Sequence, residues 1–402
     1  MDASLTKKIA IIGGGASALY LSTLLDSSKY DICIYEKNKT LGRKFLVAGS
    51  GGFNLTHSES IDKITKRYNP EGFIDSQLRQ YDNENLIKWL EAIGIPTFVG
   101  SSKRVFPIKG IKPIEVLQKI LNRLTTNQVK WEGEQTWTGW SKNGRPLIND
   151  EKEVGADIVI FCLGGASWKV TGSDGKWLPY FYKKKIEITP FQASNCAYEV
   201  AWPESFKEKY QGQPLKNISL RIDKKICKGE LVVTAQGLEG NALYALSPEL
   251  RRKTGRSRKA KVYIDLKPTL SIEVVKDKLE KSGKNTTETL KRDLKLSPVM
   301  VALVKLLISK EDFVIKPKLA KLIKNLPLEL NRAGPIDEAI STVGGIDLSE
   351  IDNNLQLKKL PNHYCIGEML DWDAPTGGYL LQACYSMAAA LANHLNKQNL
   401  SS

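Results

Sequence analysis

Residues 8–36 hold the sequence feature that most constrains the fold. They begin with a short apolar run at 9–12, pass through three glycines at 13–15, and continue into an apolar segment of helical length. A second apolar run, 32–35, ends at Glu36. Short apolar runs bounded by glycine are typical of buried parallel strands. Strand, glycine turn, helix and strand over about thirty residues predict the βαβ unit of a doubly wound α/β sheet.

The residues of this turn match the demands of a dinucleotide. Gly13 permits the turn out of the strand, and Gly15 lets the backbone approach a pyrophosphate without an intervening Cβ. Ala18 is small enough for the helix to pack closely on the strand. The helix N-terminus, with Ala16 and Ser17, offers free N–H groups to phosphate. The alternative is a tight strand-to-helix corner that binds no ligand.

The acidic residue that follows the second strand narrows the choice of nucleotide. Glu36 lies 21 positions after Gly15. A carboxylate there can accept hydrogen bonds from an adenosine ribose, and its charge repels a 2′-phosphate. The sequence therefore predicts FAD or NAD rather than NADP.

The composition is that of an ordinary globular protein. The chain has 402 residues, of which 42% are hydrophobic and 26% charged, enough for more than one domain. We find no N-terminal signal pattern and no unbroken apolar run of about 18 residues, so we expect a cytoplasmic protein. The six cysteines are scattered, without a CxxC pair or metal-ligand spacing, which predicts reduced core residues and no metal site.

A net charge of +15 raises the question of a polyanionic partner. Basic residues concentrate at 183–185 and at 251–261, and the second segment, which contains Gly255, resembles a mobile loop. No aromatic residues are interleaved with these runs. A solvated lysine-rich surface is therefore favoured over a nucleic-acid or membrane site.

Three further glycine-containing segments predict contacts with an extended cofactor. In residues 39–56, basic side chains that can face phosphate precede a glycine loop with little side-chain bulk. The apolar run 156–163 ends in a Gly-Gly pair, which suits a strand that passes beneath a cofactor. Near the C-terminus, a strand at 364–366 ends in Gly-Glu, and a Gly-Gly turn then leads into a helix that reaches about residue 395. The residues concerned are Arg43, Lys44, Gly49, Gly51, Asn54, Gly164, Gly165, Gly367, Glu368, Gly377 and Gly378.

The remaining segments predict additional layers. Helical spacing covers 86–93 and 113–124, and strand alternation over 131–148 predicts an antiparallel hairpin that turns at Asn143-Gly144. Residues 189–264 have the short alternating runs of an antiparallel β domain. Residues 271–326 have charge-rich helical spacing.

Taken together, the motifs GGGASA, GRKxxxAGSGGFNLT, LGGASW, STVGGID and CIGEMLDWDAPTGGYLLQA resemble a known family. It is the bacterial NAD(P)/FAD-dependent oxidoreductase family that includes aminoacetone oxidases and flavoproteins linked to bile-acid reduction. The C-terminal motif is most similar to a subgroup known only as uncharacterised flavoproteins.

The resemblance implies a Rossmann-type FAD-binding domain with two inserted domains. We expect 1–188 and 335–402 to form the FAD domain, 189–265 and 327–334 a β-barrel-like substrate domain, and 266–326 a helical insert. The residues implied to bind FAD are Gly13, Gly15, Ala16, Glu36, Lys37, Arg43, Lys44, Gly49, Gly51, Asn54, Gly164, Gly165, Gly367, Glu368, Gly377, Gly378 and Tyr379.

The chain departs from the family pattern at two places. Many members have Gly-Arg-Cys-Asn where this chain has Gly-Gly-Phe-Asn at 51–54, and relatives often have a histidine after Thr234, where this chain has Ala235. The substrate, the electron acceptor and the oligomeric state are therefore left open.

The function expected from the sequence is that of an FAD-dependent oxidoreductase. Hydride would pass between a small amine or unsaturated compound and flavin N5, with reoxidation by oxygen or coupling to NAD(P)H. There is no second GxGxxG, so a nicotinamide would visit the site transiently. Asn54, Arg104, Asp371 and Tyr379 are the candidates for shaping the substrate pocket, and His57 is either an acid–base group or a loop cap. The alternatives are an RNA-associated flavoprotein and a non-catalytic redox sensor.

Overall fold

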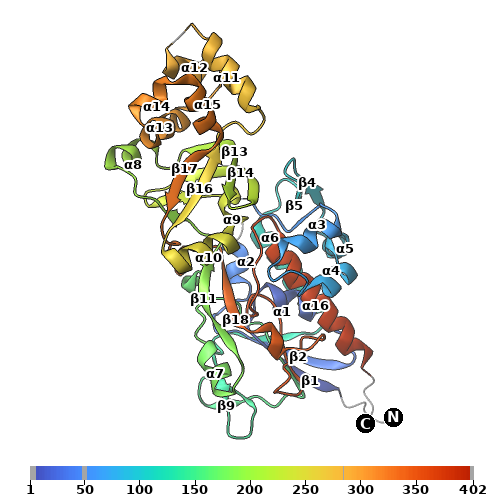
Figure 1. Cartoon of the computed structure of the whole chain (residues 1–402). Coiled ribbons are helices and arrows are strands. Elements are labelled where there is room, and N and C mark those ends of the chain that lie inside the picture. Colours follow the sequence, from blue (N-terminus) through green and yellow to red (C-terminus); the bar gives the residue numbers. More distant parts are fainter. Residues whose placement is uncertain (1–5, 48–51, 284, 399–402) are drawn as a thin grey trace. The chain divides into compact units, whose positions relative to one another are not determined.

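The computed structural model describes residues 6–47, 52–283 and 285–398. Its internal contacts divide the chain into two compact units (Figure 1). Unit 1 is Met1–Ala193 with Ile340–Ser402, and unit 2 is Ser194–Ala339. The division into three domains stays a prediction.

A five-stranded parallel sheet forms the centre of unit 1. Its strand order is β19-β10-β1-β2-β6, and in this sheet Ile9 of β1 is paired with Ile32 of β2 and with Ile158 of β10. The middle strands are almost wholly apolar because both faces of the sheet are covered. The strands are β1 (Lys7–Ile12), β2 (Tyr30–Tyr35), β6 (Lys130–Glu132), β10 (Ile158–Phe161) and β19 (His363–Cys365).

Helices from both ends of the chain pack together beside this sheet (Figure 1). α1 (Ala16–Leu24) contacts α16 (Tyr379–Lys397) and α6 (Pro113–Thr126). The Tyr20 ring of α1 lies 5.1 Å from the Trp89 ring and 5.6 Å from the Tyr385 ring of α16. The N-terminal and C-terminal segments therefore share one hydrophobic core.

A second aromatic cluster attaches a small antiparallel sheet to β10. The Trp137 ring lies 4.9 Å from Phe161 of β10 and 5.5 Å from Phe181 of α7 (Leu178–Lys183). The small sheet consists of β7 (Trp137–Trp140), β8 (Pro146–Ile148) and β9 (Lys152–Glu153).

Shorter elements complete unit 1. β3, β5 and β4 form a three-stranded sheet, and β11 pairs with β18. Their bounds are α2 (Arg43–Val47), β3 (Thr56–His57), α3 (Ile61–Ile64), η1 (Thr65–Arg67), α4 (Asp75–Gln80), α5 (Asn83–Ala92), β4 (Thr97–Val99), β5 (Arg104–Pro107), η2 (Lys169–Thr171), β11 (Ile188–Ser194), β18 (Ser341–Ile346) and η4 (Leu348–Glu350).

Unit 2 is a six-stranded antiparallel sheet with short helices. The strand order is β12-β15-β14-β13-β16-β17. Its elements are β12 (Tyr198–Glu199), α8 (Glu204–Tyr210), β13 (Pro214–Ile222), β14 (Lys225–Val233), β15 (Gly237–Glu239), α9 (Asn241–Tyr244), α10 (Ser247–Ser257), β16 (Ala260–Asp265), α11 (Ile272–Lys281), α12 (Thr286–Arg292), α13 (Pro298–Leu307), α14 (Lys310–Val314), α15 (Lys316–Lys324), β17 (Leu326–Leu330) and η3 (Ile336–Glu338). The predicted α/β Rossmann class with an inserted antiparallel sheet is confirmed.

Two local predictions were wrong. Residues 130–132 do not belong to the hairpin, because they pair in parallel with β2 as the edge strand of the central sheet. The basic segment after residue 250 is not a loop: it continues the helix α10, whose Pro248 lies in the first turn and whose Leu250 is fully buried. The charges there form the solvated face of an amphipathic helix. None of the helices in the described ranges is long and apolar enough to cross a membrane.

Candidate functional site

The predicted glycine turn forms one wall of a cavity in unit 1. Gly13 has φ +97°, and a Cβ there would lie 2.5 Å from the Cys162 carbonyl oxygen. Gly15 is the N-cap of α1, and a Cβ built on it would meet no atom within 4 Å. One glycine is thus required by packing, while the other leaves open space where a ligand can approach the helix N-terminus.

Glu36 follows β2, is only 8% exposed, and lines the same cavity. One carboxylate oxygen accepts the Gly14 N–H at 2.7 Å, and the other accepts the Asn38 backbone N–H at 2.8 Å. The second oxygen also accepts the Asn38 side-chain amide at 2.6 Å, so the oxygen that accepts the Gly14 N–H is the one that retains a lone pair. Glu36 therefore fixes the glycine turn as well as presenting an acceptor for ribose hydroxyls.

The basic residues of the next segment line the cavity but already have partners. The Lys44 ammonium lies 2.9 Å from a Glu368 carboxylate oxygen and 2.8 Å from the Ser167 hydroxyl. Arg43 donates to the Asn38 side-chain oxygen at 3.2 Å. Lys37 forms an ion pair with Asp174 at 3.0 Å. Gly49 and Gly51 lie outside the described residues.

The Gly-Gly pair after β10 meets the Gly-Glu pair after β19. Gly165 leaves no room for a Cβ, because one would collide with the Thr342 hydroxyl. Gly367 has φ +86°, and a Cβ there would collide with the Ser17 hydroxyl. The Thr342 N–H donates to Glu368 at 3.0 Å, which fixes this carboxylate at the cavity wall.

The α16 N-terminus also opens on the cavity, which Gly377, Gly378, Leu380 and Leu381 line. In the amide orientation that satisfies both of its hydrogen bonds, the Asn54 oxygen accepts the Gly378 N–H at 2.5 Å, and its nitrogen donates to Gly52 at 3.3 Å. Asn54 thereby ties the glycine loop to the α16 turn. Backbone N–H groups in the first turn of a helix lack intrahelical acceptors, so they are available to a ligand.

Tyr379 and Asp371 do not lie on the cavity wall. The Tyr379 hydroxyl donates to Glu59 at 2.6 Å, and its ring stacks on His57 with centroids 5.1 Å apart. Asp371 accepts the Gly344 N–H at 3.0 Å. Asp371 thus positions neighbouring backbone, whereas Tyr379 is held by the side chains of Glu59 and His57. Ala18, fully buried, likewise packs in the core, as expected.

Glu59 is the charged centre of the cluster behind the α16 turn. Burial alone would raise the pKa of Glu59, but hydrogen bonds from Arg67, at 2.8 and 2.9 Å, and from Tyr379 outweigh it and lower this pKa to about 2. Burial raises the pKa of Tyr379. Burial, together with the charges of Arg67 and Arg104, lowers the pKa of His57. The cluster therefore holds an ionised carboxylate and a neutral imidazole.

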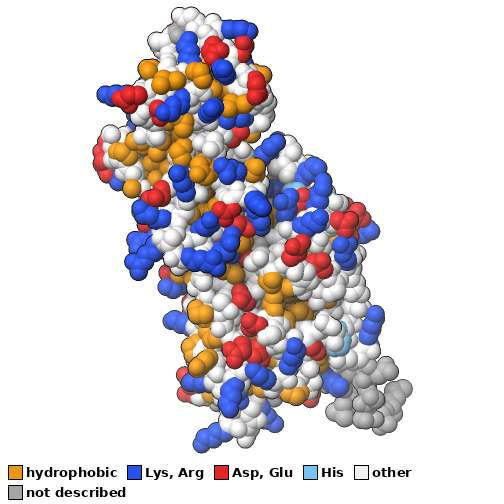
Figure 2. Space-filling model, viewed as in Figure 1, with side chains coloured by type: hydrophobic (Ala, Val, Ile, Leu, Met, Phe, Trp, Pro, Cys, Tyr) orange, Lys and Arg blue, Asp and Glu red, His pale blue; other side chains and the backbone are white. Residues whose placement is uncertain are grey.

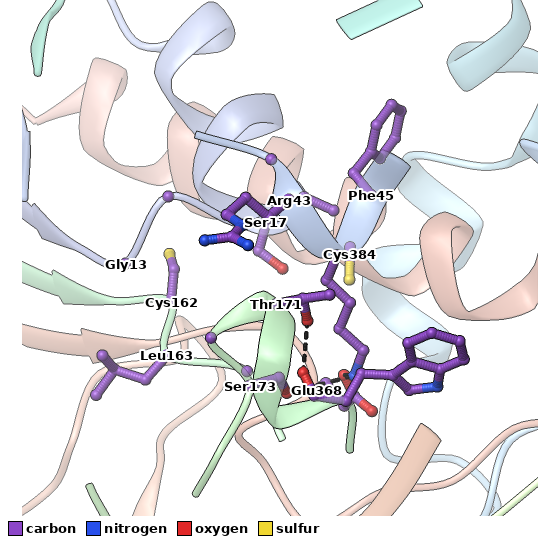
Figure 3. Close-up of a pocket in the computed structure, with 18 of the residues that line it drawn as sticks. Gly13, Ser17, Arg43, Phe45, Cys162, Leu163, Thr171, Ser173, Glu368 and Cys384 are labelled. Atoms are coloured by element: carbon purple, nitrogen blue, oxygen red, sulfur yellow. Dashed lines mark hydrogen bonds and ion pairs between the residues drawn. The ribbon is translucent and has the colours of Figure 1, made fainter. Parts of the chain in front are cut away.

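Several cavity residues were missed by sequence reasoning. They come mainly from residues 135–137 and from the loop and short helices after Gly164, and these segments reach the cavity only through the tertiary fold. Figure 3 shows Gly13 and Cys162 at strand ends, with Ser17 and Arg43 from α1 and α2 and with Ser173 and Glu368 around the same space. The missed residues include Gln135, Thr136, Trp137, Cys162, Trp168, Thr171, Ser173, Lys176, Trp177, Tyr180 and Cys384.

The residues present fit an extended dinucleotide cofactor. The cavity has a volume of about 720 Å³, within the range of small-molecule sites. Glu36 would hold the ribose, the α1 N-terminus at Gly15 the pyrophosphate, and Glu368 with the α16 turn the flavin end. Bound FAD would supply a hydride donor and acceptor. In the described part of the chain, no group of His, Cys, Asp or Glu side chains could hold a metal ion.

The parallel sheet, the glycine turn and a cavity lined from both ends of the chain place the protein among the Rossmann-type FAD-dependent oxidoreductases. The chain belongs to the HI0933-like Rossmann-domain family, whose model matches residues 7–394.

Individual relatives are distant but similar over almost their full length. A 3-dehydro-bile acid delta(4,6)-reductase of Clostridium scindens is 24% identical, over 93% of this chain and 95% of its own. A ribosomal RNA dihydrouridine synthase of Haemophilus influenzae is 24% identical, over 96% of this chain and 98% of its own. Among solved structures, a 3-ketosteroid delta1-dehydrogenase from Sterolibacterium denitrificans matches with a TM-score of 0.51 and 12% identity, over 97% of this chain and all of its own. That structural likeness shows the fold.

Proposed function

We propose that the protein is an FAD-dependent reductase that adds hydride to a carbon–carbon double bond conjugated with a carbonyl group. NADH or NADPH would supply the electrons. The names of the bacterial delta(4,6)-reductase and of the dihydrouridine synthase both denote saturation of a ring double bond. They therefore support reduction of the substrate over oxidation of an amine. The two relatives share a type of reaction rather than a substrate.

The observation that carries the proposal is one continuous cavity, lined from Glu36 and Gly15 to Arg104 and the α16 turn. Such a cavity can hold the ribose, the phosphates and the flavin in one extended ligand. The sequence has no second glycine fingerprint, so the nicotinamide would enter the same cavity, reduce the flavin and leave before the acceptor binds.

The test is the visible spectrum of the purified protein, reconstituted with FAD and kept anaerobic, before and after addition of NADH or NADPH. Bleaching of the oxidised flavin by one of them is expected. A bound flavin that neither reduces would contradict the reductase and favour an oxidase, with amines as the next substrates to test. Failure to bind FAD would contradict the cofactor.

An RNA-associated reductase is the second candidate, favoured by the dihydrouridine synthase relative and the +15 charge. On the face shown in Figure 2, Lys and Arg side chains are spread widely, with a denser group over α10. Those charges are partly neutralised, because Asp223 pairs with Lys253 at 2.8 Å. Retention on RNA that falls steeply with salt would support this candidate, and no retention at moderate salt would eliminate it.

A further inference from the structure

Arg104 differs from the other cations that line the cavity. Lys37, Arg43, Lys44 and Lys176 each lie within 4.0 Å of a carboxylate or amide oxygen. Within the described ranges, the Arg104 guanidinium has no hydrogen bond or ion pair, although it lines the same cavity. A cation without a partner, placed in a ligand cavity, is available to a ligand.

The backbone holds Arg104 in place. It is the first residue of β5, it is paired with His57 in β3, and its carbonyl accepts the Gly100 N–H at 2.8 Å. Its Nε lies 3.5 Å from the position that a Cβ on Gly377 would take, beside the first turn of α16. The guanidinium is therefore beside the part of the cavity assigned to the flavin end of the cofactor.

The ionisable side chains nearest to Arg104 do not pair with its guanidinium. The Glu59 carboxylate is occupied by two hydrogen bonds from Arg67 and one from Tyr379. His57 adds no positive charge, because burial lowers its pKa. A guanidinium in these surroundings has strong affinity for an oxygen that carries or acquires negative charge.

We propose that Arg104 binds the carbonyl or carboxylate oxygen of the acceptor, so that the substrate is an α,β-unsaturated carbonyl compound held by that oxygen. This inference rests on the proposed reductase function. Hydride delivered to the β carbon breaks the carbon–carbon π bond, and its electron pair moves through the α carbon to the oxygen beside Arg104. A proton from solvent then adds to the α carbon. The acceptor gains two electrons and two protons, and the reduced cofactor is oxidised by two electrons.

The test uses the full-length protein loaded with FAD and reduced anaerobically with dithionite, which removes any dependence on a nicotinamide. Reoxidation is followed at the flavin absorbance after excess dithionite is removed and 2-cyclohexen-1-one, crotonaldehyde or crotonate is added. The variants are Arg104→Gln, Arg104→Lys and, as a matched loss of charge outside the cavity, Lys103→Gln. FAD affinity and the flavin midpoint potential are measured for each variant.

Reoxidation of the natural protein by at least one probe is expected, slower by about 100-fold in Arg104→Gln. Partial rescue is expected in Arg104→Lys, and no change in Lys103→Gln, with FAD binding unaltered throughout. Equal rates in the natural protein and Arg104→Gln would overturn the inference and leave the reductase intact. A shifted midpoint potential with unchanged probe rates would also overturn it, because Arg104 would then act on the flavin. Reoxidation by none of the probes would overturn it too, while flavin bleaching by nicotinamide tests the reductase separately.

Discussion

The two glycines at the ends of the first turn meet different physical requirements. Gly13 is held by φ +97° and by the Cys162 carbonyl, whereas Gly15 faces open cavity. Gly13→Ala should therefore lower the free energy of unfolding by about 2–4 kcal/mol, because the added methyl group strains the backbone and overpacks the turn.

Gly15→Ala should instead weaken FAD binding by at least about tenfold, with the stability of the FAD-free protein changed by less than about 1 kcal/mol. The added methyl group would occupy the space that the phosphates need. FAD titration and urea unfolding measure the two effects. Gly155→Ala is the control, because its Cβ also meets no atom within 4 Å but lies outside the cavity wall. Equal FAD affinity in both variants would contradict the assignment of the phosphate site.

The low pKa of Glu59 should make the stability of the protein depend on pH. Its pKa is about 2 in the folded protein against an ordinary value of 4.5, so its contribution is present above about pH 4.5 and is lost as the pH falls toward 2. Glu59→Gln should lower the free energy of unfolding by about 2–3 kcal/mol at pH 7, and the difference should shrink between pH 5 and pH 3. Urea unfolding across this range measures it. The exposed Glu71→Gln should show no such convergence, and a constant difference for Glu59→Gln would refute the assignment.

At the scale of elements, the Lys44–Glu368 pair joins α2 to the loop after β19. The side chains are 27% and 17% exposed, so removal of one partner leaves the other poorly solvated. Lys44→Met should destabilise the FAD-free protein by about 1–3 kcal/mol, and Lys44→Met with Glu368→Gln should recover part of that loss. A double-mutant cycle by urea unfolding gives the coupling. The exposed Lys130–Asp31 pair, 69% and 39% exposed, should give about 0.5 kcal/mol or less. Additive effects at Lys44 and Glu368 would contradict the pairing.

Elements set by local pattern were predictable, while those set by distant partners were not. The strand, glycine turn and helix at residues 7–24 follow from their own residues, as does the helix after Gly378. The edge strand at 130–132 was misassigned, because its parallel partner β2 is a hundred residues away in sequence. The sequence predicts a loop at 251–261, where α10 continues to Ser257, because the charges obscure the amphipathic pattern that buries Leu250.

In the candidate site too, residues within local motifs were predictable, while contacts between distant residues were not. Gly15, Glu36, Arg43, Lys44 and Glu368 were assigned from motifs, and all five line the cavity. The links of Asn54 to Gly378 and of Glu59 to Tyr379 join residues more than 300 positions apart, and no periodicity encodes such contacts. The functional roles of all these residues stay predictions.

At the scale of the whole molecule, every residue that lines the cavity belongs to unit 1. The chain leaves unit 1 at the end of β11 and returns before β18, and these two strands pair. A protein in which residues 195–338 are replaced by a short Gly-Ser linker should therefore fold and bind FAD within about tenfold of the natural affinity. Circular dichroism and FAD titration test this. A folded protein that does not bind FAD would show that unit 2 contributes to the site.

The shared core of α1 and α16 has a consequence for synthesis of the protein in the cell. On the ribosome, α1 emerges before unit 2, whereas its partner α16 and the edge strand β19 emerge after it. Unit 2, which lies between them in sequence, is complete while unit 1 still lacks its C-terminal part. The N-terminal βαβ unit therefore lacks these two partners until the ribosome has synthesised the whole of unit 2, and we expect FAD to bind only after α16 has emerged.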